Sequence, residues 1–158
     1  MIQRVQSIYL FLAAVITGLM GVFSFAEVTT RGDSYQLDLL AVHYNLGEHQ
    51  VSLMDFWLLA VFVGCASVMS LVTIFLYKNR KLQITLSKLN LLLYLGVIFV
   101  VFYTGDNALN HIRTLGLEGE LSYKLGAVLP LISVILIFLA SRAIKKDEDL
   151  VRSADRIR

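Results

Sequence analysis

Four long apolar stretches constrain this chain more than any other feature of its sequence. They run over residues 7–25, 56–77, 86–104 and 125–141. A helix that crosses a bilayer needs about 20 mostly apolar residues, and each stretch comes close to that length. Lys88 is the one Asp, Glu, Lys, Arg or His within them, and it lies near a helix end, where its amine can reach the interface. The pattern predicts an all-α membrane protein with a bundle of four transmembrane helices.

The composition fits this fold class. Hydrophobic residues make up 57% of the chain, well above the share in soluble proteins. A soluble domain of 158 residues has too much surface for its volume to bury that much apolar side chain. Cys65 is the single cysteine, which excludes an intrachain disulfide and a cysteine-rich metal site. A formal net charge of +2 gives no reason to expect a nucleic-acid partner.

The basic residues indicate how the bundle lies in the membrane. Of the 14 Lys and Arg residues, 11 lie at the N-terminus, around the 78–85 loop and in the 142–158 tail. The remaining basic residues are Arg31, Arg113 and Lys124. By the positive-inside rule, both termini and the 78–85 loop are cytoplasmic, and loops 26–55 and 105–124 are external. We therefore predict a single membrane domain over residues 1–158.

The first apolar stretch has an alternative interpretation. Arg4, the apolar run and Ser24-Phe25-Ala26 together resemble a cleavable secretory signal. The run of about 19 residues exceeds the roughly 7–15 of a signal core. We therefore expect an uncleaved first helix.

Small residues recur on one face of three of the predicted spans. Helices in lipid associate where small residues let their backbones approach, so these stripes predict packing faces within the bundle or against another membrane protein. The residues are Ala14, Gly18 and Gly21 in the first span, Ala60, Gly64 and Ser67 in the second, and Gly126, Pro130 and Ser133 in the fourth. Pro130 is either a hinge or, as we favour, a proline near a helix end, where it costs little.

The external loops contain local structural signals. Residues 35–44 are rich in strand formers and lie between turn-like clusters, which predicts a small hairpin or three-stranded sheet. Loop 105–124 mixes polar residues with leucines and Ile112, as a short amphipathic helix at the interface would. Arg31-Gly32-Asp33 spells a tripeptide that integrins recognise, but Gly-Asp is common in turns and we expect a turn.

Candidate groups for chemistry are sparse. His43, His49 and His111 are all external and lie near acidic residues in the topology, yet no metal-ligand spacing joins them. We expect solvated loop histidines and assign no catalytic residue, metal or cofactor. Proton relays and ion-coupled transporters need ionisable groups within the spans. Their absence from the middle of these spans argues against a pump.

The 142–158 tail has the pattern of a cytoplasmic helix. Leu150, Val151, Ala154 and Ile157 share one face of it. Arg142, Lys145 and Lys146 lie just inside the membrane, where anionic lipid attracts them. We favour a topology anchor with a solvated helix, and the alternative is an apolar stripe that docks a partner.

The two ends of the chain and the start of the fourth span resemble a known family. MIQRVQ at 1–6, LGAVLP at 125–130 and the tail are similar to domain of unknown function 4293, small bacterial inner-membrane proteins found mainly in Bacteroidota. The resemblance implies four helices in a bacterial inner membrane. It brings no activity, ligand or site residue.

Three functional hypotheses follow. We favour a non-enzymatic scaffold, accessory subunit or assembly factor that binds another protein or a second copy of itself. The alternative is a small transporter or channel subunit for an apolar or lipid-like solute. A surface-facing enzyme or metal site built on the three histidines is the third.

Overall fold

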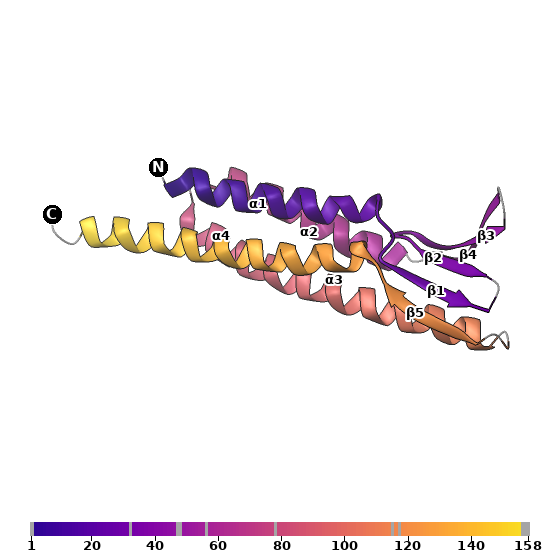
Figure 1. The fold of residues 1–158 in the computed structure, drawn as a ribbon. Coiled ribbons are helices and arrows are strands. Elements are labelled where there is room, and N and C mark those ends of the chain that lie inside the picture. The colour runs from indigo at the N-terminus through magenta and orange to yellow at the C-terminus, as the bar shows by residue number, and fades with distance from the viewer. Residues whose placement is uncertain are drawn as a thin grey trace.

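The structure, a computed structural model, describes residues 2–31, 33–46, 49–55, 57–77, 79–114, 116 and 118–155. Within these residues it contains four α-helices: α1 (Ile2–Gly18), α2 (Trp57–Phe75), α3 (Arg80–Thr114) and α4 (Leu125–Asp155). A short 3-10 turn, η1 (Leu19–Gly21), extends α1. The helices lie side by side, with a β-sheet at one end of the bundle and both chain termini at the other (Figure 1). We call these the sheet end and the termini end.

Three of the helices, α2, α3 and α4, are long and apolar enough to cross a membrane. In each of their most apolar windows no more than 33% of the residues are buried inside the protein. The outward residues include large apolar side chains such as Leu92, Phe99 and Ile135. In water such a surface would aggregate, whereas lipid accommodates it. Val5–Gly21 is also apolar but shorter.

Two helices continue beyond the predicted spans. The separate amphipathic helix expected in loop 105–124 is wrong, because α3 runs unbroken to Thr114. Likewise α4 continues from the fourth span into the tail as one helix to Asp155. Neither boundary carries a proline, and the single Gly105 at the first boundary weakens a helix without ending it, so the backbone continues into the polar segment. Gly116, with φ of 81°, follows the end of α3, and its N–H donates to the Arg113 carbonyl.

The sheet has five antiparallel strands in the order β4-β3-β2-β1-β5. Its strands are β1 (Ala26–Thr30), β2 (Ser34–Leu37), β3 (Ala41–Leu46), β4 (His49–Asp55) and β5 (Gly119–Tyr123). The first four form a meander in the first loop, which goes beyond the predicted hairpin or three-stranded sheet. Strand β5, which the sequence did not predict, comes from the second loop and pairs with β1 from Ala26↔Tyr123 to Thr30↔Gly119.

The sheet packs against the end of α3. Val28 of β1 and Ile112 of α3 are buried together with Leu37 of β2 in the apolar core. We call the five strands and residues 105–114 of α3 the sheet lobe. In the bundle, α1 packs on α2 and α4, and α3 packs on the same two helices, so the four form a closed ring.

The junction between lobe and bundle is a close backbone contact. The Gly126 N–H donates to the Ser24 carbonyl, and the Lys124 N–H donates to the Phe25 carbonyl. A Cβ at Gly126 would lie 2.7 Å from the carbonyl oxygens of Phe23 and Ser24. No side chain fits there, so glycine lets α4 begin directly on the segment that leaves α1.

Candidate functional site

The inner face of α3 carries a line of polar side chains. Gln83, Ser87, Asn90 and Tyr94 follow at intervals of four, three and four residues, which places them on one helix face. All four are buried, with at most 3% of their surface exposed. Buried polar groups are costly unless they form hydrogen bonds, so their partners indicate what this line of residues does.

Tyr94 lies at the centre of these contacts. Its hydroxyl donates to the Ala13 carbonyl of α1 at 3.3 Å and lies 3.2 Å from the Ser70 Oγ of α2. Asn90 Nδ2 donates to the same Ser70 Oγ at 2.8 Å. The Ser70 hydroxyl donates to the Ala66 carbonyl of its own helix at 3.0 Å. These bonds join α1, α2 and α3.

The fourth helix joins through Ser133. Thr17 Oγ1 of α1 donates to Ser133 Oγ at 2.7 Å. The Ser133 hydroxyl in turn lies 3.3 Å from the Ala13 carbonyl and 3.1 Å from the Leu129 carbonyl. The Ala13 carbonyl therefore receives hydroxyls from both α3 and α4. We call this set the central network: Thr17, Ser70, Asn90, Tyr94 and Ser133, with the Ala13 carbonyl.

Two glutamines make further contacts between helices nearer the termini end. Gln83 Nε2 donates to the Thr73 carbonyl at 3.2 Å, which connects α3 to α2. Gln6 Nε2 donates to the Ala143 carbonyl at 3.1 Å, which connects α1 to α4. Each amide thus bonds the backbone of a neighbouring helix. Together with the central network, these bonds hold adjacent helices at fixed heights relative to one another.

The network consists of hydroxyl and amide groups only. Among the described residues, every buried polar side chain is uncharged. A nucleophilic or general-base mechanism needs a group that titrates near the working pH beside the hydroxyl, and the network holds none. The described residues also contain no cluster of three or more His, Cys, Asp or Glu that could hold a metal. The geometry is that of hydrogen bonding between helices.

The predicted packing residues of α4 lie at tight contacts. Gly126 and Pro130 are buried, and Ser133 belongs to the central network. Pro130 lies inside a continuous α4 close to its start. A proline in the first turns of a helix removes little hydrogen bonding, which accords with the low-cost interpretation.

The predicted packing residues of α1 and α2 lie mostly on the surface. Ala14 is buried against the core. Added Cβ atoms at two of the exposed glycines would meet nothing within 4 Å. The three glycines are exposed, namely Gly18, Gly21 and Gly64. The other two residues, Ala60 and Ser67, are half-buried. These positions do not form packing faces inside the bundle, so contact with another membrane protein remains a prediction.

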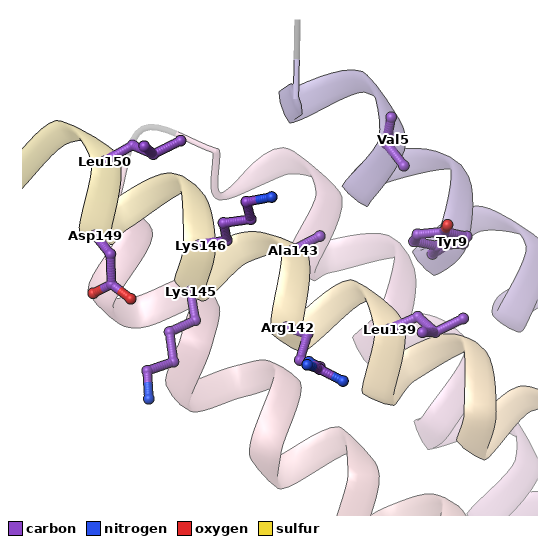
Figure 2. Close-up of a pocket in the computed structure, with 9 residues that line it drawn as sticks. All are labelled: Val5, Tyr9, Leu139, Arg142, Ala143, Lys145, Lys146, Asp149 and Leu150. Atoms are coloured by element: carbon purple, nitrogen blue, oxygen red, sulfur yellow. The ribbon is translucent and has the colours of Figure 1, made fainter.

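The predicted partner-binding face lies near the end of α4. Leu150 is 50% exposed and Val151 is 42% exposed. The Ala154 side chain and Ile157 lie outside the described residues. Leu150 also lines an open groove that α4 forms with α1 (Figure 2).

The three histidines are not brought together. His111 is exposed on α3, which packs on β1 and β5. His43 and His49 lie on β3 and β4, toward the opposite edge of the sheet, and their side chains lie outside the described part. A joint site built from the three therefore gains no support from the strand order.

The Arg31-Gly32-Asp33 tripeptide lies in the connection between β1 and β2. The Thr30 N–H donates to the Asp33 carbonyl at 2.9 Å. Arg31 forms an exposed ion pair with Glu118, with 2.9 Å between Nη2 and Oε2. Arg31 and Asp33 lie between two paired antiparallel strands, as the turn interpretation expects, and Gly32 lies outside the described residues.

Tyr123 connects the end of β5 to α3. Its ring packs edge-on against Phe102, with centroids 5.0 Å apart. Burial raises the pKa of the Tyr123 hydroxyl above its ordinary value, and the negative charge of Asp106 adds to the effect. The neutral phenol is therefore the stable form at this contact.

Comparison with known families assigns the chain. The family described as a domain of unknown function (DUF4293) matches residues 2–157. The chain belongs to this family. A search of curated proteins finds no match to it. The resemblance inferred from the chain ends is thus confirmed, and the family description adds no activity to the central network.

Sequence reasoning missed the central network, although part of its signal was visible. The sequence-based prediction rested on ionisable groups within the spans, and the described part of the bundle buries none. The spacing of Gln83, Ser87, Asn90 and Tyr94 on one helix face was the signal that could have revealed it. No local pattern could have shown that Ser133 and Tyr94 share the Ala13 carbonyl.

Proposed function

We propose that the protein is a bacterial inner-membrane protein that spans the bilayer four times, with both termini in the cytoplasm. We further propose that it acts as a non-enzymatic scaffold or accessory subunit that binds another protein. The bias of basic residues toward the termini end supports the orientation. For the fourth crossing, α1 and η1 together run from Ile2 to Gly21 beside α4.

The length of α4 is the observation that carries the functional proposal. Its 31 residues extend about 46 Å at 1.5 Å per residue. The hydrocarbon core of a bilayer is about 30 Å thick, so roughly 16 Å of helix would project into the cytoplasm. Leu150 and Val151 are exposed on that projection, beyond the hydrocarbon core. Exposed apolar residues on a rigid arm suit docking to a partner.

The central network supports the same function. Its hydrogen bonds join all four helices: hydroxyls of α3 and α4 meet at the Ala13 carbonyl of α1, and Ser70 of α2 joins through α3. A bundle held in this way suits a fixed base for the projecting arm. Alternating access would require these bonds to break in each cycle, which favours a scaffold over a transporter.

The experiment is affinity purification from native membranes in mild detergent with quantitative mass spectrometry. We compare the full chain, a chain ending after Lys146, and two point variants, Leu150→Glu and Arg152→Gln. Both point variants lower the net charge by one, and their positions lie about 200° apart around the helix. We expect a stoichiometric partner with the full chain and Arg152→Gln that is lost with Leu150→Glu and the truncation. A chain that is always alone and monomeric would contradict the proposal.

Orientation has its own test. Starting from Cys65→Ala, we add single cysteines at Ser122 in β5, at Ser153 near the end of α4, and ahead of Met1. A membrane-impermeant maleimide should label the Ser122 position in intact cells and the other two only after permeabilisation. Labelling of the N-terminal cysteine in intact cells would mean that α1 does not cross.

A transport role remains as the second candidate, a subunit for an apolar or lipid-like solute. It is favoured by two buried atoms on the α3 face, Ser87 Oγ and Asn90 Oδ1, which have no hydrogen-bond partner among the described residues. A solute with a polar end could bind there. Proteoliposomes that move no fluorescent lipid or apolar solute faster than protein-free vesicles would exclude this role.

A further inference from the structure

An open groove runs between α1 and α4 at the termini end, with a volume of about 820 Å³. Val5 and Tyr9 line it from α1, and all its other lining residues come from α4 (Figure 2). The contact between Gln6 and the Ala143 carbonyl holds the two helices together at this height. Ala143 is small, so the helices leave space beside it.

The groove has an apolar part and a cationic part in sequence along α4. Leu139 lies beside Tyr9 at the part nearer the bundle centre, and Val5 lies further toward the termini end (Figure 2). Arg142, Lys145 and Lys146 follow, and Lys146 points toward α1 (Figure 2). Three basic residues against the single acid Asp149 leave the lining with a net charge of +2.

These three cations are not neutralised by the neighbouring acids. Asp147, which follows Lys146 on α4, pairs with Arg80 of α3, with 3.4 Å between Oδ2 and Nη2. Within the part of the chain that the structure describes, Arg142, Lys145 and Lys146 form no ion pair. Asp147 is therefore paired with Arg80 and does not neutralise the three cations, so the groove keeps its positive charge.

The height of the groove matches the boundary of a bilayer. Arg142 lies about 26 Å along the helix axis from Leu125, the first residue of α4. In a membrane with a hydrocarbon core of about 30 Å, Arg142 would lie at the edge of that core. Lys145 and Lys146 would lie one turn further out, at the level of the phosphate groups.

We propose that this groove binds an anionic phospholipid of the cytoplasmic leaflet. The phosphate lies at Arg142, Lys145 and Lys146, and an acyl chain follows Val5, Tyr9 and Leu139. Basic pockets between transmembrane helices on the cytoplasmic side are suited to anionic headgroups. An acidic peptide would satisfy the cations but would leave the apolar part at membrane depth uncovered. The inference needs the membrane placement proposed above and does not depend on a protein partner.

The test uses the purified full-length chain in mild detergent, with bound lipid counted by native mass spectrometry. Phosphatidylglycerol and cardiolipin are titrated as anionic lipids, phosphatidylcholine as the neutral lipid, and inorganic phosphate as the headgroup chemistry without a tail. The test variant is Lys145→Gln with Lys146→Gln. The matched control is Lys81→Gln with Lys88→Gln, which removes two exposed lysines near the same end of α3.

We expect the anionic lipids to bind at one molecule per chain, well ahead of phosphatidylcholine. Each basic residue near an anionic headgroup contributes enough that losing two should weaken binding by roughly 30-fold. The control pair should change it by less than about 3-fold, and Lys145→Arg with Lys146→Arg should keep it, which also shows that the positions tolerate substitution.

Three outcomes would overturn the proposal. Equal losses in the test and control variants would mean general attraction to a basic surface. Equal binding of phosphatidylcholine would mean that the groove does not select charge. Competition by inorganic phosphate at the same concentration as the lipid would mean a free-anion site. Because no partner protein is present, none of these results bears on the scaffold function.

Discussion

The sheet lobe and the helix bundle bury different kinds of side chain. In the lobe, the core is apolar, with Val28, Leu37 and Ile112 almost fully buried, and the ion pair of Arg31 with Glu118 lies at the surface. In the bundle, the termini half buries amides and hydroxyls on α2 and α3, among them Ser70 and Asn90. The lobe excludes polar side chains from its centre, whereas the bundle connects its helices through them.

The difference follows from the two solvents. In water, removing apolar surface is the main favourable term, so the lobe is stabilised by its apolar core. In lipid, the surroundings are as apolar as a leucine, and helices associate through close packing and hydrogen bonds. The central network therefore lies where apolar contact stabilises helix association least. Each region is held together by the interaction that is effective in its own solvent.

The largest effect is expected where the two regions meet. Replacing Gly126 by leucine forces a side chain against the carbonyls of Phe23 and Ser24, and we expect a loss of about 4 kcal/mol in the free energy of unfolding. Gly64→Leu is the control, because a Cβ there meets nothing within 4 Å. Unfolding in mixed micelles measures both. Equal stability of the two variants would mean that the junction does not couple lobe and bundle.

A cavity in the lobe should come next. We expect Ile112→Ala to cost about 3 kcal/mol, as buried isoleucine truncations do. Hydrogen exchange should rise in β1 and β5 while α2 keeps its protection. The same substitution at Ile135, which faces outward from the bundle, should change little. Uniform deprotection of α2 together with the strands would show that the two regions unfold as one unit.

A smaller effect tests the hydrogen bonds of the bundle. A double-mutant cycle on Ser70→Ala and Asn90→Ala should give a coupling energy of about 1 kcal/mol, the range for hydrogen bonds between membrane helices. A cycle on Ser70→Ala and Thr85→Ala, whose hydroxyl bonds its own helix, should give none. If both cycles gave zero, packing alone would hold the bundle and the contrast with the lobe would fail.

The smallest effects concern the surface of the lobe. Arg31 and Glu118 are both more than 80% exposed, so Glu118→Gln should change stability by less than about 0.5 kcal/mol. Glu27 is mostly buried where it meets Lys124 at 2.6 Å, so Glu27→Gln should cost more. Chemical unfolding at low and high salt separates the two pairs. A larger loss at Glu118 would reverse this order.

Sequence reasoning predicted the four helices because apolar runs of membrane length have few alternatives. It ended the third helix at residue 104, whereas α3 continues to Thr114, and it predicted a helical tail without joining that tail to the fourth span. Charge ends a membrane span but does not end a helix. For α3 the actual signal was Gly116, whose positive φ suits the residue just beyond a helix.

Other features depended on contacts between distant segments. Residues 119–123 become a strand only because β1 offers an unpaired edge, and nothing local in Gly-Glu-Leu-Ser-Tyr requires this. The small-residue rule did not distinguish contacts within the bundle from contacts with another protein at Gly18 and Gly64, because it identifies faces that allow close approach without identifying what approaches them. The groove between α1 and α4 likewise combines a basic cluster that was recognised from the sequence with Val5 and Tyr9, which were not.

The pairing of β5 with β1 has a consequence for biosynthesis. Glu27 leaves the ribosome long before its partner Ser122, and at about 5–20 residues per second the delay is several seconds. In the proposed orientation, the first four strands would reach the far side of the membrane with one edge open until the third helix has inserted. Pairing of β5 with β1 would then require that the hairpin of α2 and α3 has crossed the membrane in the correct orientation. A quality-control protease that recognises unpaired strand edges would destroy chains whose insertion had stalled.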